Sequence, residues 1–149
     1  MKPIYRAYLE ILKSFVADRK PELLPEDDPG ELLRLAGIHT TPGIVAYTYM
    51  RWPELTDEAT LERMRRCCLD TFALYVRRGE EMKALMEKLG EAGIDHLVMK
   101  GFVVKDYYTV PELRAYGDID FVIRPEDRKQ CDELMRSLGY TCETDYEPV

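Results

Sequence analysis

Apolar residues recur every three or four positions through most of the first 92 residues, which is the spacing of one face of an α-helix. The longest such pattern covers residues 57 to 92 and places eight residues on one stripe: Leu61, Met64, Cys68, Phe72, Tyr75, Met82, Leu85 and Leu89. A stripe of this kind is typical of a long core helix or of a helix–helix seam. Gly79 interrupts it and could divide the helix into two.

Three shorter helices are predicted before this stripe, two of them from helix-start signals. Asp28-Pro29 and Thr41-Pro42 each combine an N-cap residue with proline at the first helical position. They predict helices that end near Gly37 and near Arg51. A helix over residues 3 to 18 follows from one apolar face: Ile4, Tyr8, Ile11, Leu12 and Phe15. Residues 1 to 92 therefore form a helical N-terminal region.

The pattern changes after Gly93, where short apolar runs replace long stripes. Residues 94 to 99 and 118 to 123 are predicted strands, and a short helix from Gly101 to Tyr107 lies between them. Arg124-Pro125 opens another helix, whose buried face is Cys131, Leu134, Met135 and Leu138. A third strand is expected over residues 140 to 143. The fold class is α/β (α+β), with a βαβαβ unit over residues 93 to 149 that forms one compact unit with the helical region.

Asp118 and Asp120 are the clearest candidate ligands for a metal. Alternate residues of a strand project from the same face, so the two carboxylates would lie side by side. Two like charges on one face repel each other unless a cation lies between them. Mg²⁺ prefers carboxylate oxygens and suits this place. Without such a cation, an Asp-x-Asp pair is ordinary solvated surface.

Four segments of the last third together resemble a known family. They are Met99-Lys100-Gly101, Leu113-Arg114, the run Gly117-Asp118-Ile119-Asp120-Phe121-Val122, and Leu138-Gly139-Tyr140. In this order they are similar to the nucleotidyltransferase superfamily with its polymerase-beta-like fold. The closest likeness is to a bacterial group described as uncharacterised nucleotidyltransferases. The resemblance implies a transferase that moves a nucleoside monophosphate from a nucleoside triphosphate, ATP by default, to a small-molecule or protein acceptor.

The resemblance also implies roles for individual residues. Asp118 and Asp120 would be the catalytic residues and would hold one or two Mg²⁺ ions, which clamp the reacting oxygens. Four further residues would bind the nucleotide: Lys100, Gly101, Arg114 and Gly117. Lys100 and Arg114 would supply cations, Gly101 the start of a helix, and Gly117 room for close approach. Three of these residues also have plainer interpretations: a solvated Lys100, a tight turn at Gly101, and an Arg114 paired with an acid such as Glu112.

The chain departs from the superfamily pattern in two places. Lys100-Gly101-Phe102 replaces the usual pair of small residues, although the Lys-Gly form is usual in the closer group. The superfamily's third carboxylate falls on Glu143, on Asp145 or beyond Val149, which would make this chain a fragment.

Charge and cysteine content narrow the classes of partner. The formal net charge of −7 argues against DNA and makes RNA less attractive, whereas a nucleotide carried by Mg²⁺ is compatible with it. Two short helices around residues 29 to 51 suggest a helix-turn-helix, but the second carries a single basic residue, Arg51. Four cysteines without CxxC spacing predict buried, reduced thiols rather than zinc. The absence of a leader pattern or membrane span predicts a soluble, cytoplasmic protein.

Three functional hypotheses remain open from the sequence. The first is a Mg²⁺-dependent nucleotidyltransferase. The second is a catalytically incomplete module that binds nucleotide or metal without turnover, because the third carboxylate is not placed. The third is a helical protein-interaction domain, based on the apolar stripe from Leu61 to Leu89.

Overall fold

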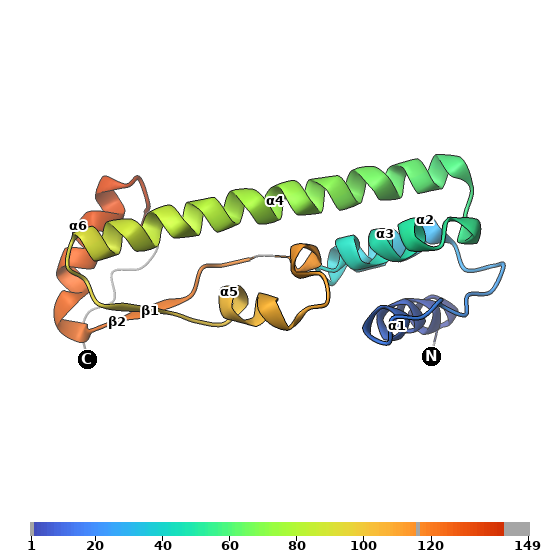
Figure 1. Ribbon diagram of the computed structural model, residues 1–149, viewed down its shortest axis with the longest axis horizontal. Helices are drawn as coiled ribbons and strands as arrows, with labels where there is room; N and C mark the ends of the chain where they lie inside the picture. The colour runs from blue at the N-terminus through green and yellow to red at the C-terminus, as the bar shows by residue number, and fades with distance from the viewer. Residues whose placement is uncertain (1, 116, 142–149) are drawn as a thin grey trace.

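One long helix, α4 (Glu58–Glu91), runs along the length of the molecule, and the other elements lie beneath it or at its end (Figure 1). The computed structural model describes residues 2–115 and 117–141. Asp57 caps the start of α4 by accepting a hydrogen bond from the Thr60 N–H. The division considered at Gly79 does not occur, because α4 continues through it. A single glycine costs a helix only about 1 kcal/mol, which packing of the flanking turns easily offsets.

Three helices precede α4: α1 (Pro3–Val16), α2 (Pro29–Ile38) and α3 (Pro42–Arg51). Of these, α3 packs on the N-terminal half of α4, and α1 and α2 pack against α3. The predicted helix starts are confirmed for α2 and α3. The Asp28 carboxylate accepts hydrogen bonds from the Gly30 and Glu31 N–H groups. Thr41 precedes α3 without capping it, and its hydroxyl instead lies 2.6 Å from the Tyr8 hydroxyl, which ties α1 to α3.

The buried side chains form two clusters that both include α4. The larger joins α1, α2, α3 and the first half of α4, and its fully buried members include Ile11, Leu32, Val45, Tyr49 and Met64. The smaller joins the end of α4 to the segments that follow it and consists of Leu85, Leu89, Ile94 and Cys131. The apolar stripe predicted for residues 57 to 92 thus supplies both cores.

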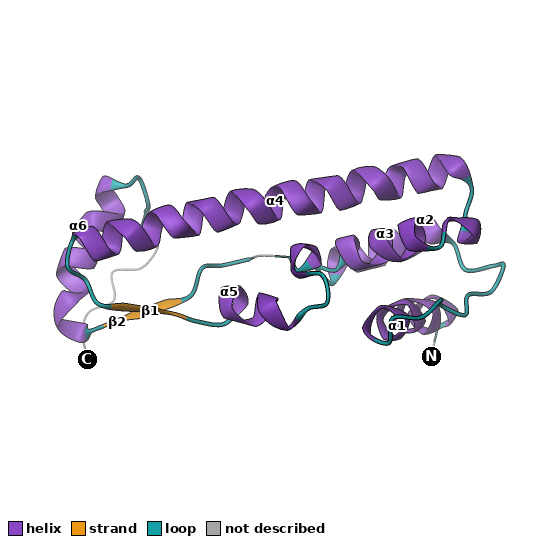
Figure 2. Cartoon of the chain, in the orientation of Figure 1, coloured by secondary structure: helices purple, strands orange, loops and turns teal. Residues whose placement is uncertain are grey.

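The sheet has two antiparallel strands, β1 (His96–Val98) and β2 (Phe121–Ile123), drawn in orange in Figure 2. Leu97 pairs with Val122, and the Met99 N–H donates to the Asp120 carbonyl at 2.9 Å, which extends the pairing by one step. Asp118 and Asp120 were expected on a strand, but β2 begins at Phe121. They lie in the extended segment that leads into it.

Short helices link the strands and follow them. After β1 come α5 (Gly101–Val104) and the 3₁₀ turns η2 (Lys105–Tyr107) and η3 (Pro111–Leu113). After β2 come η4 (Pro125–Asp127) and α6 (Arg128–Ser137), which buries Cys131. Leu138 was expected on the buried face of α6 but is exposed, because the helix ends before it. The described part of the chain is therefore mixed α+β and mostly helical.

The third strand expected over residues 140 to 143 is not confirmed. Tyr140 and Thr141 form no strand, and the other two positions lie outside the described residues. The βαβαβ unit is consequently not confirmed either. Within the described ranges, no helix combines the length and the apolar character needed to cross a bilayer.

The described cysteines agree with the expectation of free, protected thiols. Cys68 and Cys131 are buried, Cys67 is half-buried, and all three are free. Burial raises the pKa of each of these thiols, which keeps them protonated and unreactive. Cys142 lies outside the described residues.

Candidate active site

Lys100 stands at the turn between β1 and α5 in an unusual backbone conformation. Its φ is 48° and its ψ is −113°, a combination that residues other than glycine rarely adopt. The helix α5 begins directly after this turn, at Gly101. Strained residues of this kind are concentrated at functional sites, where surrounding structure holds them in place.

Lys100 forms an ion pair with Asp120, 20 residues further along the chain. Its Nζ lies 3.1 Å from Oδ1 of Asp120. The strand register explains the contact, since Met99 pairs with Asp120 through the backbone and Lys100 follows directly. Both side chains reach solvent, with 69% of Lys100 and 35% of Asp120 exposed. The structure thus brings together two of the sequence-predicted site residues.

Arg114 and Gly101 form a second contact, which joins the segment before β2 to the start of α5. The Arg114 Nη1 donates a hydrogen bond to the Gly101 carbonyl, and its guanidinium lies 5.8 Å from the centre of the Tyr108 ring. A Cβ at position 101 would lie 3.3 Å from that Nη1, so glycine allows the close approach. In the described part of the chain Arg114 forms no ion pair with Glu112.

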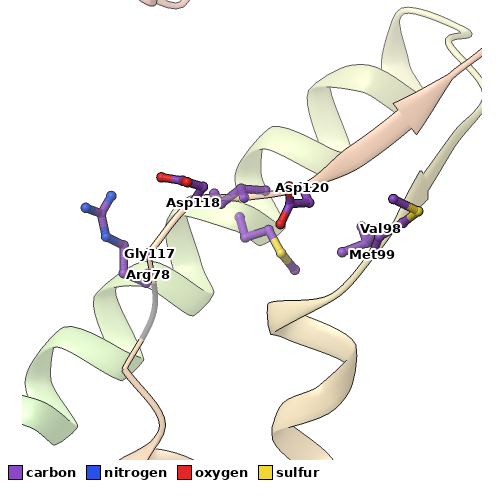
Figure 3. A pocket seen from close by; sticks show the side chains of 8 residues that line it. Arg78, Val98, Met99, Gly117, Asp118 and Asp120 are labelled. Atoms are coloured by element: carbon purple, nitrogen blue, oxygen red, sulfur yellow. The ribbon is translucent and has the colours of Figure 1, made fainter. Parts of the chain in front are cut away.

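A small cavity separates these residues from α4 (Figure 3). Its lining joins α4 to the two strand segments and consists of Arg78, Met82, Val98, Met99, Gly117, Asp118, Ile119 and Asp120. The cavity measures about 10 Å³, enough for a single water molecule. A nucleotide at this place would therefore lie on the open surface beside the cavity.

The two aspartates face different sides of this region. Figure 3 shows the Asp118 carboxylate directed toward the side of Arg78 and the Asp120 carboxylate directed toward the side of β1. Asp118 is exposed, whereas Asp120 is partly enclosed and paired with Lys100. The four predicted nucleotide-binding residues and both aspartates lie on the segments around the ends of β1 and β2.

A family model described as uncharacterised nucleotidyltransferase matches residues 25–148. The chain belongs to this family. No curated protein matches the chain, and no solved structure matches it either. The family match begins before α2 and so includes helices α2 to α4, whereas the motifs quoted from the sequence cover only the last third.

Asp118 and Asp120 are the residues that could supply carboxylate ligands to the magnesium expected of an uncharacterised nucleotidyltransferase. Mg²⁺ commonly binds one or two protein carboxylates and takes its remaining ligands from water and substrate phosphates. Asp118 and Asp120 beside an open surface are a donor set of that size. Among the described residues there is no group of three or more His, Cys, Asp or Glu side chains close enough to hold a metal. Glu143 and Asp145, the candidates for the third carboxylate, lie outside those residues.

Sequence reasoning missed the contribution of α4 to this region. Arg78 and Met82 both line the cavity. They are four positions apart, so they lie one turn apart on the same face of the helix. Met82 belongs to the predicted stripe, and a cation one turn before a stripe residue was the available signal.

Proposed function

We propose that this nucleotidyltransferase moves a nucleoside monophosphate from a nucleoside triphosphate to a hydroxyl of a small molecule or a protein, with Mg²⁺. The observation that supports this most is the ion pair between Lys100 and Asp120. It places a cation suited to phosphates next to a carboxylate suited to a metal, at the ends of two paired strands. The family membership supports the same class of reaction.

In the proposed reaction, an oxygen of the acceptor hydroxyl forms a bond to the α-phosphorus of the triphosphate. The bond from that phosphorus to the bridging oxygen breaks, and its electron pair leaves with pyrophosphate. The hydroxyl proton passes to solvent. Mg²⁺ bound by Asp118 and Asp120 would neutralise phosphate charge and orient the reacting oxygens.

Lys100 is the residue that we propose to bind the phosphates after leaving Asp120. An exposed ion pair contributes at most about 1 kcal/mol, so exchanging the carboxylate for a phosphate costs little. Its four-carbon side chain carries the ammonium on rotatable bonds, which allows the change of partner. Mg²⁺ binding to Asp120 would favour the exchange, because the metal competes with Lys100 for the same carboxylate.

Arg114 and Gly101 are proposed to fix the start of α5 against the nucleotide. A guanidinium has five N–H donors, and the Gly101 carbonyl accepts from Nη1 alone. The remaining donors can reach a phosphate while the contact with Gly101 persists. Gly117 lines the cavity next to Asp118, where the lack of a side chain leaves room for a ligand.

Calorimetric titration of ATP with and without Mg²⁺ tests this proposal. The variants are the double mutant Asp118→Asn, Asp120→Asn and a matched control, Asp95→Asn, Asp106→Asn. The control removes two exposed carboxylates that pair with Arg124 and Lys105 away from the cavity. We expect Mg²⁺-dependent binding in the wild type and in the control, and loss of binding in the double mutant.

Two other results would point elsewhere. Equal binding by the double mutant would contradict the assignment of the site. Mg²⁺-dependent binding without transfer to any of a panel of hydroxyl acceptors, with pyrophosphate release as the measure of transfer, would favour the binding module without turnover.

A further inference from the structure

Arg78 is a cation at the cavity that the sequence motifs do not include. It lies on α4, more than twenty residues before the motif segments, and reaches them because α4 passes over the sheet (Figure 1). Met82, one turn later, is 5% exposed and packs into the same cavity. This packing fixes the rotation of α4 and directs Arg78 to the edge where Gly117 and Asp118 lie (Figure 3).

The hydrogen bonds of Arg78 leave part of its guanidinium unused. Nη1 donates to Oε2 of Glu81 at 2.9 Å, which holds the side chain in place. Nε is buried, and within the described ranges it has no hydrogen-bond acceptor. A buried donor without an acceptor is unfavourable, so an anion that accepted its hydrogen bond would be stabilised here. Solvent still reaches the side chain, which is 42% exposed.

The arrangement of charges around the two aspartates indicates which anion fits. Figure 3 shows Asp118 and Asp120 between Arg78 on one side and the end of β1, which leads to Lys100, on the other. Cations on both sides of a pair of metal-binding carboxylates suit a ligand with several phosphates. The planar guanidinium is also suited to bidentate phosphate contacts, which an ammonium cannot make.

We propose that Arg78 is a nucleotide-binding residue that holds the phosphate tail of the triphosphate, the part released as pyrophosphate. This inference rests on the proposed function, because it assumes that the nucleotide binds beside Asp118 and Asp120. The competing explanation is that Arg78 is a counter-charge for the two carboxylates. That role would make no contact with a nucleotide.

Arg77 provides a matched control for the test. It precedes Arg78 on the same helix, and its Nε lies 3.7 Å from the same residue, Glu81. Its side chain is 66% exposed and does not line the cavity. Arg77→Gln and Arg78→Gln therefore remove the same charge and the same helix-surface partner, but only the second changes the site.

The experiment is calorimetric titration of both variants and the wild type with ATP and with AMP, each in the presence of Mg²⁺. We expect Arg78→Gln to bind ATP about tenfold more weakly, the effect of losing one charge-assisted hydrogen bond. Its AMP affinity should be unchanged, because AMP lacks the phosphate tail. Arg77→Gln should match the wild type, and Arg78→Lys should recover only part of the loss.

Unchanged ATP affinity in Arg78→Gln would overturn the inference, and so would an equal loss for ATP and AMP. Tighter Mg²⁺ binding with unchanged ATP binding would assign Arg78 the counter-charge role instead. None of these results would contradict the proposed function if the Asp118→Asn, Asp120→Asn variant still failed to bind ATP. Failure of the wild type to bind ATP would overturn both. Should Arg78→Gln not fold, Arg78→Lys provides the same comparison.

Discussion

At the scale of single residues, Lys100 combines an unfavourable backbone with a useful side chain. A non-glycine residue in such a conformation costs about 1–3 kcal/mol. Glycine would occupy φ 48° without that cost, yet the chain has a lysine there. The ion pair with Asp120 is too exposed to compensate. We therefore assign Lys100 a role in ligand binding rather than in stability.

Replacing Lys100 should separate stability from binding. Lys100→Gly is expected to raise the free energy of unfolding by about 1 kcal/mol, because the strain disappears, and to weaken Mg²⁺-ATP binding. Lys100→Gln keeps the strain, so it should weaken binding without the gain in stability. Urea unfolding and calorimetry measure the two effects. Loss of stability in Lys100→Gly would show that the ammonium stabilises the fold instead.

At the scale of elements, α4 contains a glycine that its packing does not require. A Cβ at Gly79 would meet nothing within 4 Å, whereas a Cβ at Gly43 in α3 would lie 2.8 Å from Cγ2 of Thr71. Gly43 thus allows α3 and α4 to pack closely. Gly79 only lowers the helix propensity of α4, by about 0.5–1 kcal/mol relative to alanine.

The two glycines should consequently respond to alanine in opposite ways. Gly79→Ala is expected to stabilise the protein by about 0.5–1 kcal/mol, and Gly43→Ala to destabilise it by about 1–3 kcal/mol through overpacking. Urea unfolding of both variants measures the difference. Destabilisation by Gly79→Ala would indicate that α4 is not a continuous helix at that point.

The N-cap residue of α4, Asp57, makes the stability of the protein depend on pH. The Thr60 N–H and hydroxyl hold the pKa of Asp57 below its ordinary value of 3.8. The folded pKa lies below the unfolded one, so the cap stabilises fully above about pH 4 and is lost as the pH falls through the folded pKa. Asparagine also caps helices but does not titrate here.

Thermal unfolding of wild type and Asp57→Asn between pH 3 and pH 7 tests this prediction. The midpoint of the wild type relative to the variant should fall as the pH drops below about 4. A difference that stays constant over the whole range would show that Asp57 does not act through its charge.

At the scale of the whole molecule, α4 connects two separate cores. The residues of the larger cluster lie on α1, α2, α3 and the first half of α4, together with Leu113 of η3, and those of the smaller lie at the end of α4 and on the segments after it. The division into a helical region to residue 92 and an α/β unit from residue 93 stays a prediction. A helix shared by both cores favours one cooperative unit.

Leu89→Ala tests that cooperativity from a distance. Leu89 is fully buried in the smaller cluster, so its truncation should cost about 2–5 kcal/mol. Trp52, the single tryptophan of the chain, follows α3 near the larger cluster. If the molecule unfolds as one unit, Trp52 fluorescence and far-ultraviolet circular dichroism will shift to the same lower urea midpoint. An unshifted fluorescence transition would mean that the two parts unfold independently.

Local signals predicted much of this molecule, and contacts between distant segments account for what was missed. Asp28-Pro29 and Thr41-Pro42 marked helix starts correctly, because proline at the first helical position acts locally, and Asp28 also caps its helix. The pairing of Lys100 with Asp120 depends on strand register, which no local pattern specifies.

The same distinction explains the remaining differences at the site. Arg114 was expected to bind phosphate or to pair with Glu112, yet its guanidinium donates to the Gly101 carbonyl through the fold of residues 101 to 114. The position of Arg78 depends on which face of α4 is turned toward the sheet. The burial of Met82 fixes that face. The order of the motifs therefore predicted the family, but it did not predict which charged side chains surround the candidate site.

The most direct test of the central claim is a crystal structure with Mg²⁺ and an ATP analogue whose α–β bridging oxygen is replaced by carbon. That substitution prevents the proposed bond cleavage and keeps the nucleotide intact. We expect the metal on the carboxylates of Asp118 and Asp120, with Lys100 and Arg78 on the phosphate tail. A nucleotide bound elsewhere, or a metal that contacts neither aspartate, would contradict it.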